Sequence, residues 1–231
     1  MIHILPFADA APFVKEMNNF KRTKNLSTGG QLHCWDWPVQ GKVVRTYEFP
    51  IYMCPSDPTL PHNGWGKNSY AGNGGNNRTG SILTTVCPSC GNNQWGQTRN
   101  GAEISGMFGR FDWCARFRDV SDGTSNVFHA GEVLPGCNDW QRYGITRAIG
   151  AVAWTTPGMN IGIRNCQGGA VDPTGLWNRN QGEARGFRSQ HTGGGHFLLC
   201  DGTVRFVTEL IDARTFHRLG DRRDGEIIGE F

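Results

Sequence analysis

Two short, mostly apolar runs lie close together near the C-terminal end of the chain. They span His196–Cys200 and Thr203–Val207, and their length and position beside turn residues are typical of β-strands. The Asp201-Gly202 pair between the two segments is a strong signal for a tight turn. A type I′ turn needs positive φ at both central residues, which Asp tolerates and Gly adopts freely. We therefore predict a β-hairpin with a type I′ turn at Asp201-Gly202.

Two segments carry helical spacing. Phe13, Met17 and Phe20 recur on one face of a helix predicted over Pro6–Phe20, with Asp9 as its cap and Pro12 in the first turn. After the hairpin, Asp212 can cap a short helix, Ala213–Leu219, which ends at Gly220. We expect the first helix to place its apolar stripe on the core.

Further strands are predicted where short apolar runs are bounded by turn residues. Val43–Phe49 alternates, Pro50 interrupts it, and Ile51–Cys54 resumes it. The turn residues of Asp122–Asn126 lead into the apolar segment Val127–Glu132, and Ala148–Thr155 is a further short apolar run.

The remaining segments are polar or aromatic. Asn63–Asn100 and Gly158–Gly186 are rich in Gly and Asn and show no period, and aromatic-rich Gly106–Phe117 is expected to be a strand or a buried turn. The pattern as a whole favours an α+β fold: an antiparallel-sheet-dominated globular head with long loops and one or two short helices.

Length and composition indicate one domain with long loops rather than two domains. A chain of 231 residues can bury one sizeable core, and its 33 Gly and 11 Pro place much of it in turns and loops. We expect residues 1–231 to form a single domain. A formal net charge of +3 without a long basic run argues against nucleic-acid binding.

The cysteine content points to an oxidising compartment. An even count in a loop-rich chain suggests disulfides, and we expect at least two. The eight candidates are Cys34, Cys54, Cys87, Cys90, Cys114, Cys137, Cys166 and Cys200. The spacing of Cys87 and Cys90 also suits half of a zinc knuckle or a redox motif, but no second pair at that spacing exists, so we favour a structural role.

Four polar residues are the first candidates for chemistry: His191, Asp201, Asp122 and Glu132. A His/Asp/Glu set can bind a metal or perform acid–base catalysis. We nevertheless favour structural roles, because Asp201 and Asp122 are explained by their turns and His191 can tie down its glycine-rich loop. In that model the imidazole lies near the Asp201 end of the hairpin or near the Asp122 turn.

The eight Trp residues lie largely in loop-like segments. Loop Trp can stack on sugars, but it can equally cover a small core, and we favour the second role. No nucleophile elbow, phosphate loop or dinucleotide fingerprint occurs in the sequence.

His191, nine intervening residues and Asp201-Gly202 resemble the signature of the bacterial prepilin-type processing-associated family. Other segments support the resemblance in the same order along the chain. They include Cys54-Pro55 with Asp57, Ser69–Asn73, Asp122-Gly123 with Ser125 and Asn126, Glu132, and Gly225–Ile228. The resemblance implies a pilin-like head but supplies no catalytic residues.

Members of that family normally begin with a long apolar helix that anchors them in the membrane and forms the fibre core. The chain shows no such segment, no targeting signal and no run of 18 or more apolar residues. Three explanations fit: an N-terminally truncated fragment, a misassigned start, or a paralogue without the anchor. We expect no membrane contact for this segment.

These observations predict a non-enzymatic extracytoplasmic module, structural or interacting, related to the pseudopilins of type II secretion and pilus systems. We expect no cofactor, and protein partners from a pilin-type or secretion-type assembly. Two alternatives stay open. One is a carbohydrate- or ligand-binding domain using loop aromatics, and the other is a metal-dependent hydrolase around His191.

Overall fold

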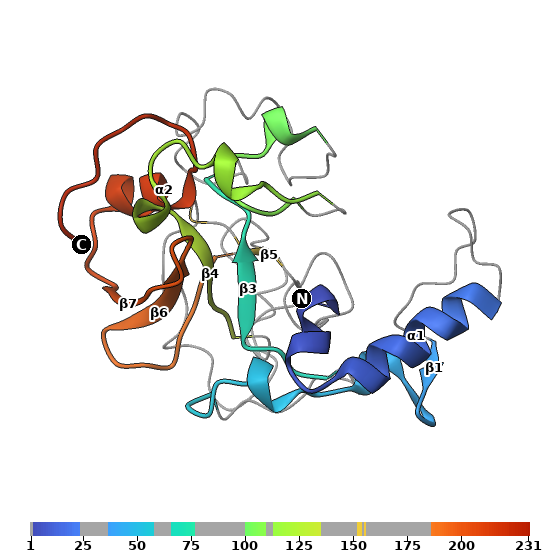
Figure 1. Cartoon of the computed structure of the whole chain (residues 1–231). Coiled ribbons are helices and arrows are strands. Elements are labelled where there is room, and N and C mark those ends of the chain that lie inside the picture. Colours follow the sequence, from blue (N-terminus) through green and yellow to red (C-terminus); the bar gives the residue numbers. More distant parts are fainter. Residues whose placement is uncertain are drawn as a thin grey trace, which may run out of the picture.

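The computed structural model has an α+β fold built on one five-stranded sheet (Figure 1). It describes residues 2–23, 37–57, 66–76, 100–109, 113–134, 152–153, 155 and 186–231. The strand order is β5-β3-β4-β6-β7, and neighbours run antiparallel except for the parallel pair β3 and β5. The strands are β3 (Tyr70–Asn73), β4 (Phe128–Glu132), β5 (Val152–Ala153), β6 (Gly194–Leu199) and β7 (Val204–Thr208). The expected fold class is confirmed.

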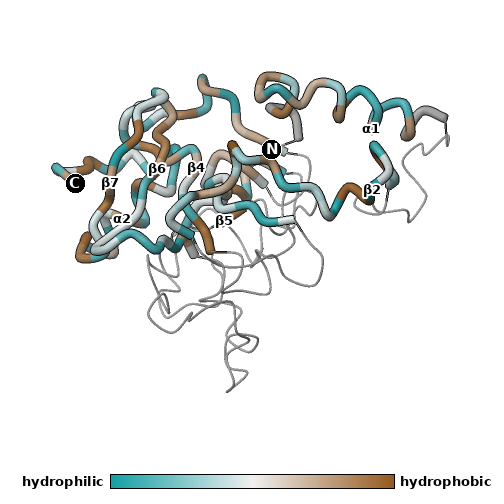
Figure 2. The backbone as a smooth tube through the Cα atoms, turned by 90° about the horizontal axis from the view of Figure 1, so that it is seen from below, coloured by the Kyte–Doolittle hydropathy of each residue, from teal (hydrophilic) through white to brown (hydrophobic). Residues whose placement is uncertain are grey.

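The first residues form a separate layer beside the sheet. A 3-10 helix (Ile2–Phe7) leads into helix α1 (Ala11–Thr23), which packs on the small hairpin of β1 (Pro38–Val39) and β2 (Lys42–Val43). Figures 1 and 2 show α1 on the side of the molecule away from β7 and the C-terminus. Phe13 and Met17 are buried in this layer, as the helical spacing predicts. No helix among the described residues is long and apolar enough to cross a bilayer.

Aromatic side chains form the core of the sheet. Helix α2 (Ala213–Gly220) places Phe216 against Phe128 and Phe197, with ring centroids 5.7 Å from each. Phe187 packs against Phe197 at 5.0 Å. The predicted cap is confirmed, because the Asp212 carboxylate accepts the backbone N–H of Thr215 at 2.9 Å.

The predicted C-terminal hairpin is confirmed, but its turn type is wrong. Gly202 has φ +90°, whereas Asp201 is not among the residues with positive φ. The N–H of Gly202 donates to the carbonyl of Leu199, and Leu199 donates to Thr203. This is the pattern of a type I turn followed by a left-handed glycine, the usual three-residue hairpin loop. Positive φ at both central residues occurs instead at Gln40-Gly41, between β1 and β2.

The strands predicted over Val43–Phe49 and Ile51–Cys54 are wrong. Only Val43 lies in a strand, and 3-10 turns follow at Val44–Thr46 and Pro50–Tyr52. Tyr47 and Phe49 both pack on Phe13 of α1, at 4.7 and 5.2 Å between centroids. In a strand, odd-numbered and even-numbered side chains would point to opposite faces. Here odd-numbered Tyr47 and Phe49 pack in the same cluster as even-numbered Val44 and Tyr52. The burial of both parities favours turns over a regular strand.

Other boundaries differ in smaller ways. Strand β3 lies within the segment that shows no sequence period, and α1 begins at Ala11 because Asp9 takes φ 56° and Pro6 belongs to the preceding 3-10 helix. Phe108 and Cys114 form an isolated bridge within the aromatic-rich segment. The predicted strand over Val127–Glu132 is confirmed as β4. Further 3-10 turns span Gly101–Glu103, Phe117–Asp119 and Thr124–Asn126.

Candidate metal centre

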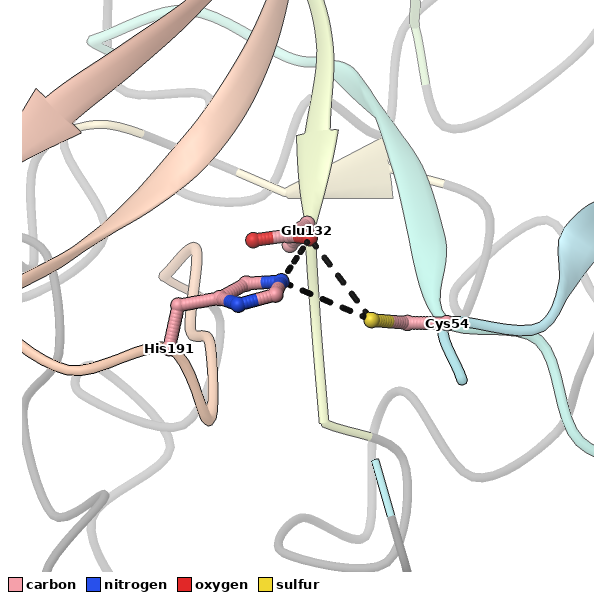
Figure 3. A group of neighbouring side chains, drawn as sticks. All are labelled: Cys54, Glu132 and His191. Carbon is pink, nitrogen blue, oxygen red and sulfur yellow. Dashed lines mark hydrogen bonds and ion pairs between the residues drawn. The ribbon is translucent and has the colours of Figure 1, made fainter. Parts of the chain in front are cut away.

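Three side chains from distant parts of the chain meet beyond one end of the sheet (Figure 3). Their donor atoms are Cys54 Sγ, Glu132 Oε1 and His191 Nε2. The nitrogen lies 3.2 Å from the carboxylate oxygen and 3.7 Å from the sulfur, and the sulfur lies 3.8 Å from the same oxygen. All three point toward one another, and we call them the Cys–Glu–His cluster.

Each member is placed by a different element. Glu132 is the last residue of β4. Cys54 follows the 3-10 turn Pro50–Tyr52, and its carbonyl accepts the N–H of Asp57, closing a turn. That turn is fastened to the sheet through Ser69, whose N–H donates to Tyr52 and whose carbonyl accepts from Val133. The sulfur is therefore positioned by β3 and by the end of β4 rather than by its own local structure.

A buried ion pair between Asp57 and Lys67 stabilises the turn that follows Cys54. Asp57 Oδ2 lies 3.0 Å from Lys67 Nζ, and Ser69 Oγ donates to the same carboxylate at 3.3 Å. The Lys67 ammonium also donates to the Asp57 carbonyl. A buried carboxylate of this kind requires a partner, so Asp57 acts in the structure as an anchor for the turn.

His191 is held by the loop that precedes β6. Its backbone N–H donates to Ser189 Oγ at 3.0 Å, and the N–H of Arg188 donates to the Glu132 carbonyl at 2.8 Å. The His191 side chain is 28% exposed, whereas that of Glu132 is 6% exposed. The cluster is thus buried on the Glu132 side and open to solvent on the His191 side.

The missing side chain of Gly195 allows Glu132 to lie close to β6. A Cβ at this position would come within 3.0 Å of Ser189 Cβ and 3.3 Å of Glu132 Oε2. In its absence Oε2 accepts the backbone N–H of His196 at 2.9 Å. The His196 ring lies near the same carboxylate, with Nδ1 3.6 Å from Oε1, and meets the His191 ring edge-on at 4.7 Å.

Tyr70 borders the cluster. It pairs with Glu132 across β3 and β4. Burial raises the pKa of the Tyr70 hydroxyl, and the negative charges of Cys54 and Glu132 raise it further. The phenol is thereby kept neutral beside the cluster.

The sequence candidates separate into two groups. His191 and Glu132 meet, but Asp201 and Asp122 lie at the other end of the sheet. Asp201 Oδ1 accepts the N–H of Thr203 at 2.8 Å, as expected for a turn residue, and this bond is the main cause of its lowered pKa. The expectation that His191 lies near Asp201 or Asp122 is therefore wrong, because strand β6 separates them.

Asp122 does not have the role expected of it. Its carboxylate accepts the N–H groups of Asp224 and Gly225, at 2.7 and 3.1 Å, instead of capping its own turn. Within the turn, Asn126 Nδ2 donates to the Asp122 carbonyl, Gly123 takes φ +92°, and Ser125 bonds Asp201. These residues join two turns and the C-terminal segment.

The described cysteines form no disulfide. Cys54, Cys114 and Cys200 are free thiols, so the expected bridges are not confirmed for these three. Burial raises the pKa of Cys200 to about 12. Cys34, Cys87, Cys90, Cys137 and Cys166 lie outside the described residues.

Sequence reasoning grouped His191 with Glu132 as candidates for chemistry, but it named Cys54 only as a disulfide candidate and a residue of the family segments. It missed Gly195 and His196 as their neighbours. Of the Trp residues within the described ranges, Trp37 is buried and Trp113 lies under the Arg222 guanidinium, 5.1 Å from it. The remaining six Trp lie outside those ranges.

One known protein family matches a region of the chain that includes every residue of this site. The family model described as protein of unknown function (DUF1559) matches residues 1–214. The chain belongs to the DUF1559 family. The matched DUF1559 region contains the Cys–Glu–His cluster and Asp201-Gly202. No curated protein and no solved structure matches the chain.

Proposed function

We propose that the chain is a non-enzymatic extracytoplasmic structural or interaction module, the pseudopilin-like head of a secretion-type or pilus-type assembly. Its membership of an uncharacterised family and its α+β fold are compatible with this role. The resemblance of His191, Asp201 and Gly202 to the prepilin-type signature supplies the link to pilin-like proteins. Its partners in this proposal are other pilin-type heads.

The open edge of the sheet is the observation that carries the proposal. Within the described ranges β7 pairs with β6 and with no strand on its other side. Val204 is 63% exposed, and Phe206 on the same face is also exposed. Soluble proteins usually protect such edges with charge or proline. The one charged residue in β7, Arg205, lies instead over the Phe231 ring, 4.9 Å from its centroid.

The geometry of the cluster gives little support to a nucleophilic enzyme. A catalytic Cys–His–acid arrangement uses one ring nitrogen to take the thiol proton and the other to bond the orienting carboxylate. Here Cys54 Sγ and Glu132 Oε1 both approach Nε2 of His191. This leaves no relay through the ring, so we place the function in binding and assembly.

Self-association through β7 tests the proposal. We expect the purified chain to associate with increasing concentration in sedimentation velocity, because the heads of a pilin-type assembly pack against one another. Val204→Lys should weaken association by at least about 10-fold, equivalent to about 1.4 kcal/mol. Phe7→Lys, at an exposed apolar residue of the N-terminal layer, is the matched control and should leave it unchanged. Equal behaviour of the two variants, or a wild type that stays monomeric at high concentration, would contradict the proposal.

The proposed location has its own test. Protease added to spheroplasts of the native host, from which any outer membrane has been opened, should degrade the protein if it lies outside the cytoplasmic membrane. Its recovery, undigested, with soluble cytosolic markers would contradict an extracytoplasmic location.

A further inference from the structure

We propose that Cys54, Glu132 and His191 bind one divalent transition metal of the zinc class. This site goes beyond the proposed assembly role and does not depend on it. The proposal rests on the spacing of three donor atoms, on the chemistry of those donors, and on the support that the surrounding backbone gives them.

The spacing matches a tetrahedral zinc ion. Zinc binds sulfur, nitrogen and carboxylate oxygen at about 2.0–2.3 Å, so neighbouring ligands of a tetrahedron lie about 3.4–3.6 Å apart. The three separations in the cluster are 3.2, 3.7 and 3.8 Å. An ion at the centre of this triangle needs only small side-chain movements to reach all three atoms.

Hydrogen bonding alone does not account for the convergence. Nε2 of His191 offers either one proton or one lone pair, yet it faces both a sulfur and a carboxylate oxygen. The two sulfur separations, 3.7 and 3.8 Å, are near the limit for hydrogen bonds to sulfur. A cation at the centre is bound by all three atoms at once, with Cys54 as its thiolate.

The donor set selects the class of metal. Calcium and magnesium take oxygen ligands, so a sulfur and an imidazole disfavour them. One thiolate, one imidazole and one carboxylate suit zinc, a borderline-soft ion that accepts all three. The divalent charge also offsets the two negative ligands in a largely buried place.

Neighbouring groups hold the ligands in position. The His196 N–H fixes Oε2 of Glu132, which leaves Oε1 directed at the cluster. Such outer contacts orient ligands and raise metal affinity. The His196 ring nitrogen is not among the three mutually close donor atoms, so we assign His196 as a positioning residue. The exposed side of His191 leaves the fourth position to solvent.

Zinc stoichiometry and affinity test the site. The full chain, freed of any tag, is stripped with chelator, reloaded with Zn²⁺, desalted and measured by elemental analysis and by competition with a chromophoric chelator. Cys54→Ser and His191→Ala should each remove one equivalent, or weaken it by more than the 10–100-fold typical of outer-contact losses. Glu132→Gln should weaken it as well. Circular dichroism shows whether each variant is folded.

Two controls separate this site from other thiols. Cys114→Ser removes an exposed cysteine outside the cluster and should leave the equivalent bound. The double variant Cys87→Ser, Cys90→Ser removes the pair with zinc-knuckle spacing and should also retain it. With Co²⁺ as the probe, the thiolate-to-cobalt charge-transfer band should be present in both controls and absent in Cys54→Ser.

The contrary results are equally definite. A folded wild type that takes up no zinc overturns the site. So does zinc lost only from the Cys87/Cys90 variant, or a cobalt band that persists in Cys54→Ser. Where His191→Ala fails to fold, the folded Cys54→Ser protein decides the outcome.

Discussion

The two ends of the sheet use the same kinds of polar residue in opposite ways. At one end, which we call the site end, Glu132 and the residues before β6 bring side chains together. At the other, the turn end, polar side chains of Asp122, Asp201 and Arg222 bond to backbone. The difference separates polar side chains that bond mainly to backbone from polar side chains that contact one another.

At the turn end, polar side chains bond mainly to backbone carbonyls and N–H groups. Arg222 donates to the carbonyls of Gly106 and Gly101, at 2.8 and 3.0 Å, and to that of Ile104. Asn73 likewise donates to Phe128 and Gly220, at 2.7 and 2.9 Å. Such groups have little capacity left for a ligand.

At the site end, the contacts join side chain to side chain and are longer. Three donor atoms lie within 4.8 Å of one another, and the backbone N–H of His196 bonds the other carboxylate oxygen of Glu132, Oε2. The His-x9-Asp-Gly spacing spans both ends, because β6 lies between His191 and Asp201. Six extended residues separate them by roughly 20 Å. His191 and Asp201-Gly202 therefore have different roles: His191 belongs to the Cys–Glu–His cluster, and Asp201-Gly202 forms the hairpin turn.

Removing Arg222 is expected to have the largest effect on stability. Arg222→Met leaves three backbone carbonyls of the turn end without their donor, so the free energy of unfolding should fall by about 3–5 kcal/mol. Arg223→Met removes an exposed neighbour that donates to one carbonyl, Ala102, and should cost under about 1 kcal/mol. Urea denaturation measures both. Similar losses in the two variants would mean that the backbone bonds of Arg222 do not stabilise the turn end.

Asp221 should make the turn end less stable as pH rises. Burial is the largest cause that raises the pKa of Asp221 to about 6; within that shift the Arg223 N–H and the Arg222 charge lower the pKa, and the charges of Asp224 and Asp122 raise it. Between about pH 4 and 6 the folded protein keeps a proton that the unfolded chain has released. Stability is therefore lost as pH rises through this window, by at most about 3 kcal/mol.

Asp221→Asn isolates this contribution. The variant should match the wild type near pH 4 and be more stable above pH 6 in denaturation curves. The pKa of Asp212 is shifted in the opposite direction, because the Thr215 N–H lowers the pKa of that exposed carboxyl. Asp212→Asn therefore serves as the comparison variant. A constant difference between Asp221→Asn and wild type at all pH values would refute the assignment.

Metal removal should affect only the site end. With zinc at about 100 times its dissociation constant, chelation should lower the free energy of unfolding of the wild type by about 2.7 kcal/mol. The same treatment should leave His191→Ala unchanged. Without metal, we expect His191→Ala to cost only about 1 kcal/mol, because its side chain is partly exposed. Thermal denaturation with and without chelator checks both values, and equal responses of the two proteins would argue against the comparison.

The smallest expected effect tests the hairpin turn. Gly202 has φ +90° and open space around its Cα, so Gly202→Val adds backbone strain without a clash and should cost about 1–3 kcal/mol. Gly229→Val also has open space but no positive φ, and it should be nearly neutral. Equal midpoints for the two variants in urea would show that the positive φ at residue 202 does not require glycine in this turn.

Local patterns predicted the elements that depend on near neighbours in the sequence. The hairpin, strand β4 and the Asp212-capped helix follow from alternation, turn residues and a cap within a few positions. The Val43–Phe49 prediction failed because packing on Phe13 of α1 decided the conformation, and α1 is distant in sequence. Strand β3 was missed because its short sequence has no alternation and depends on β4 and β5 for its pairing.

The sequence alone singled out His191 and Glu132 as candidates for chemistry, and Cys54 as a disulfide candidate and a residue of the family segments. Only the tertiary structure decided that these three meet and that Asp201 does not join them. The positions of Cys54 and His191 differ by 137 in sequence, so no local spacing relates them. Their contact depends on the pairing of β3, β4 and β6, which a pattern of polar and apolar residues does not specify.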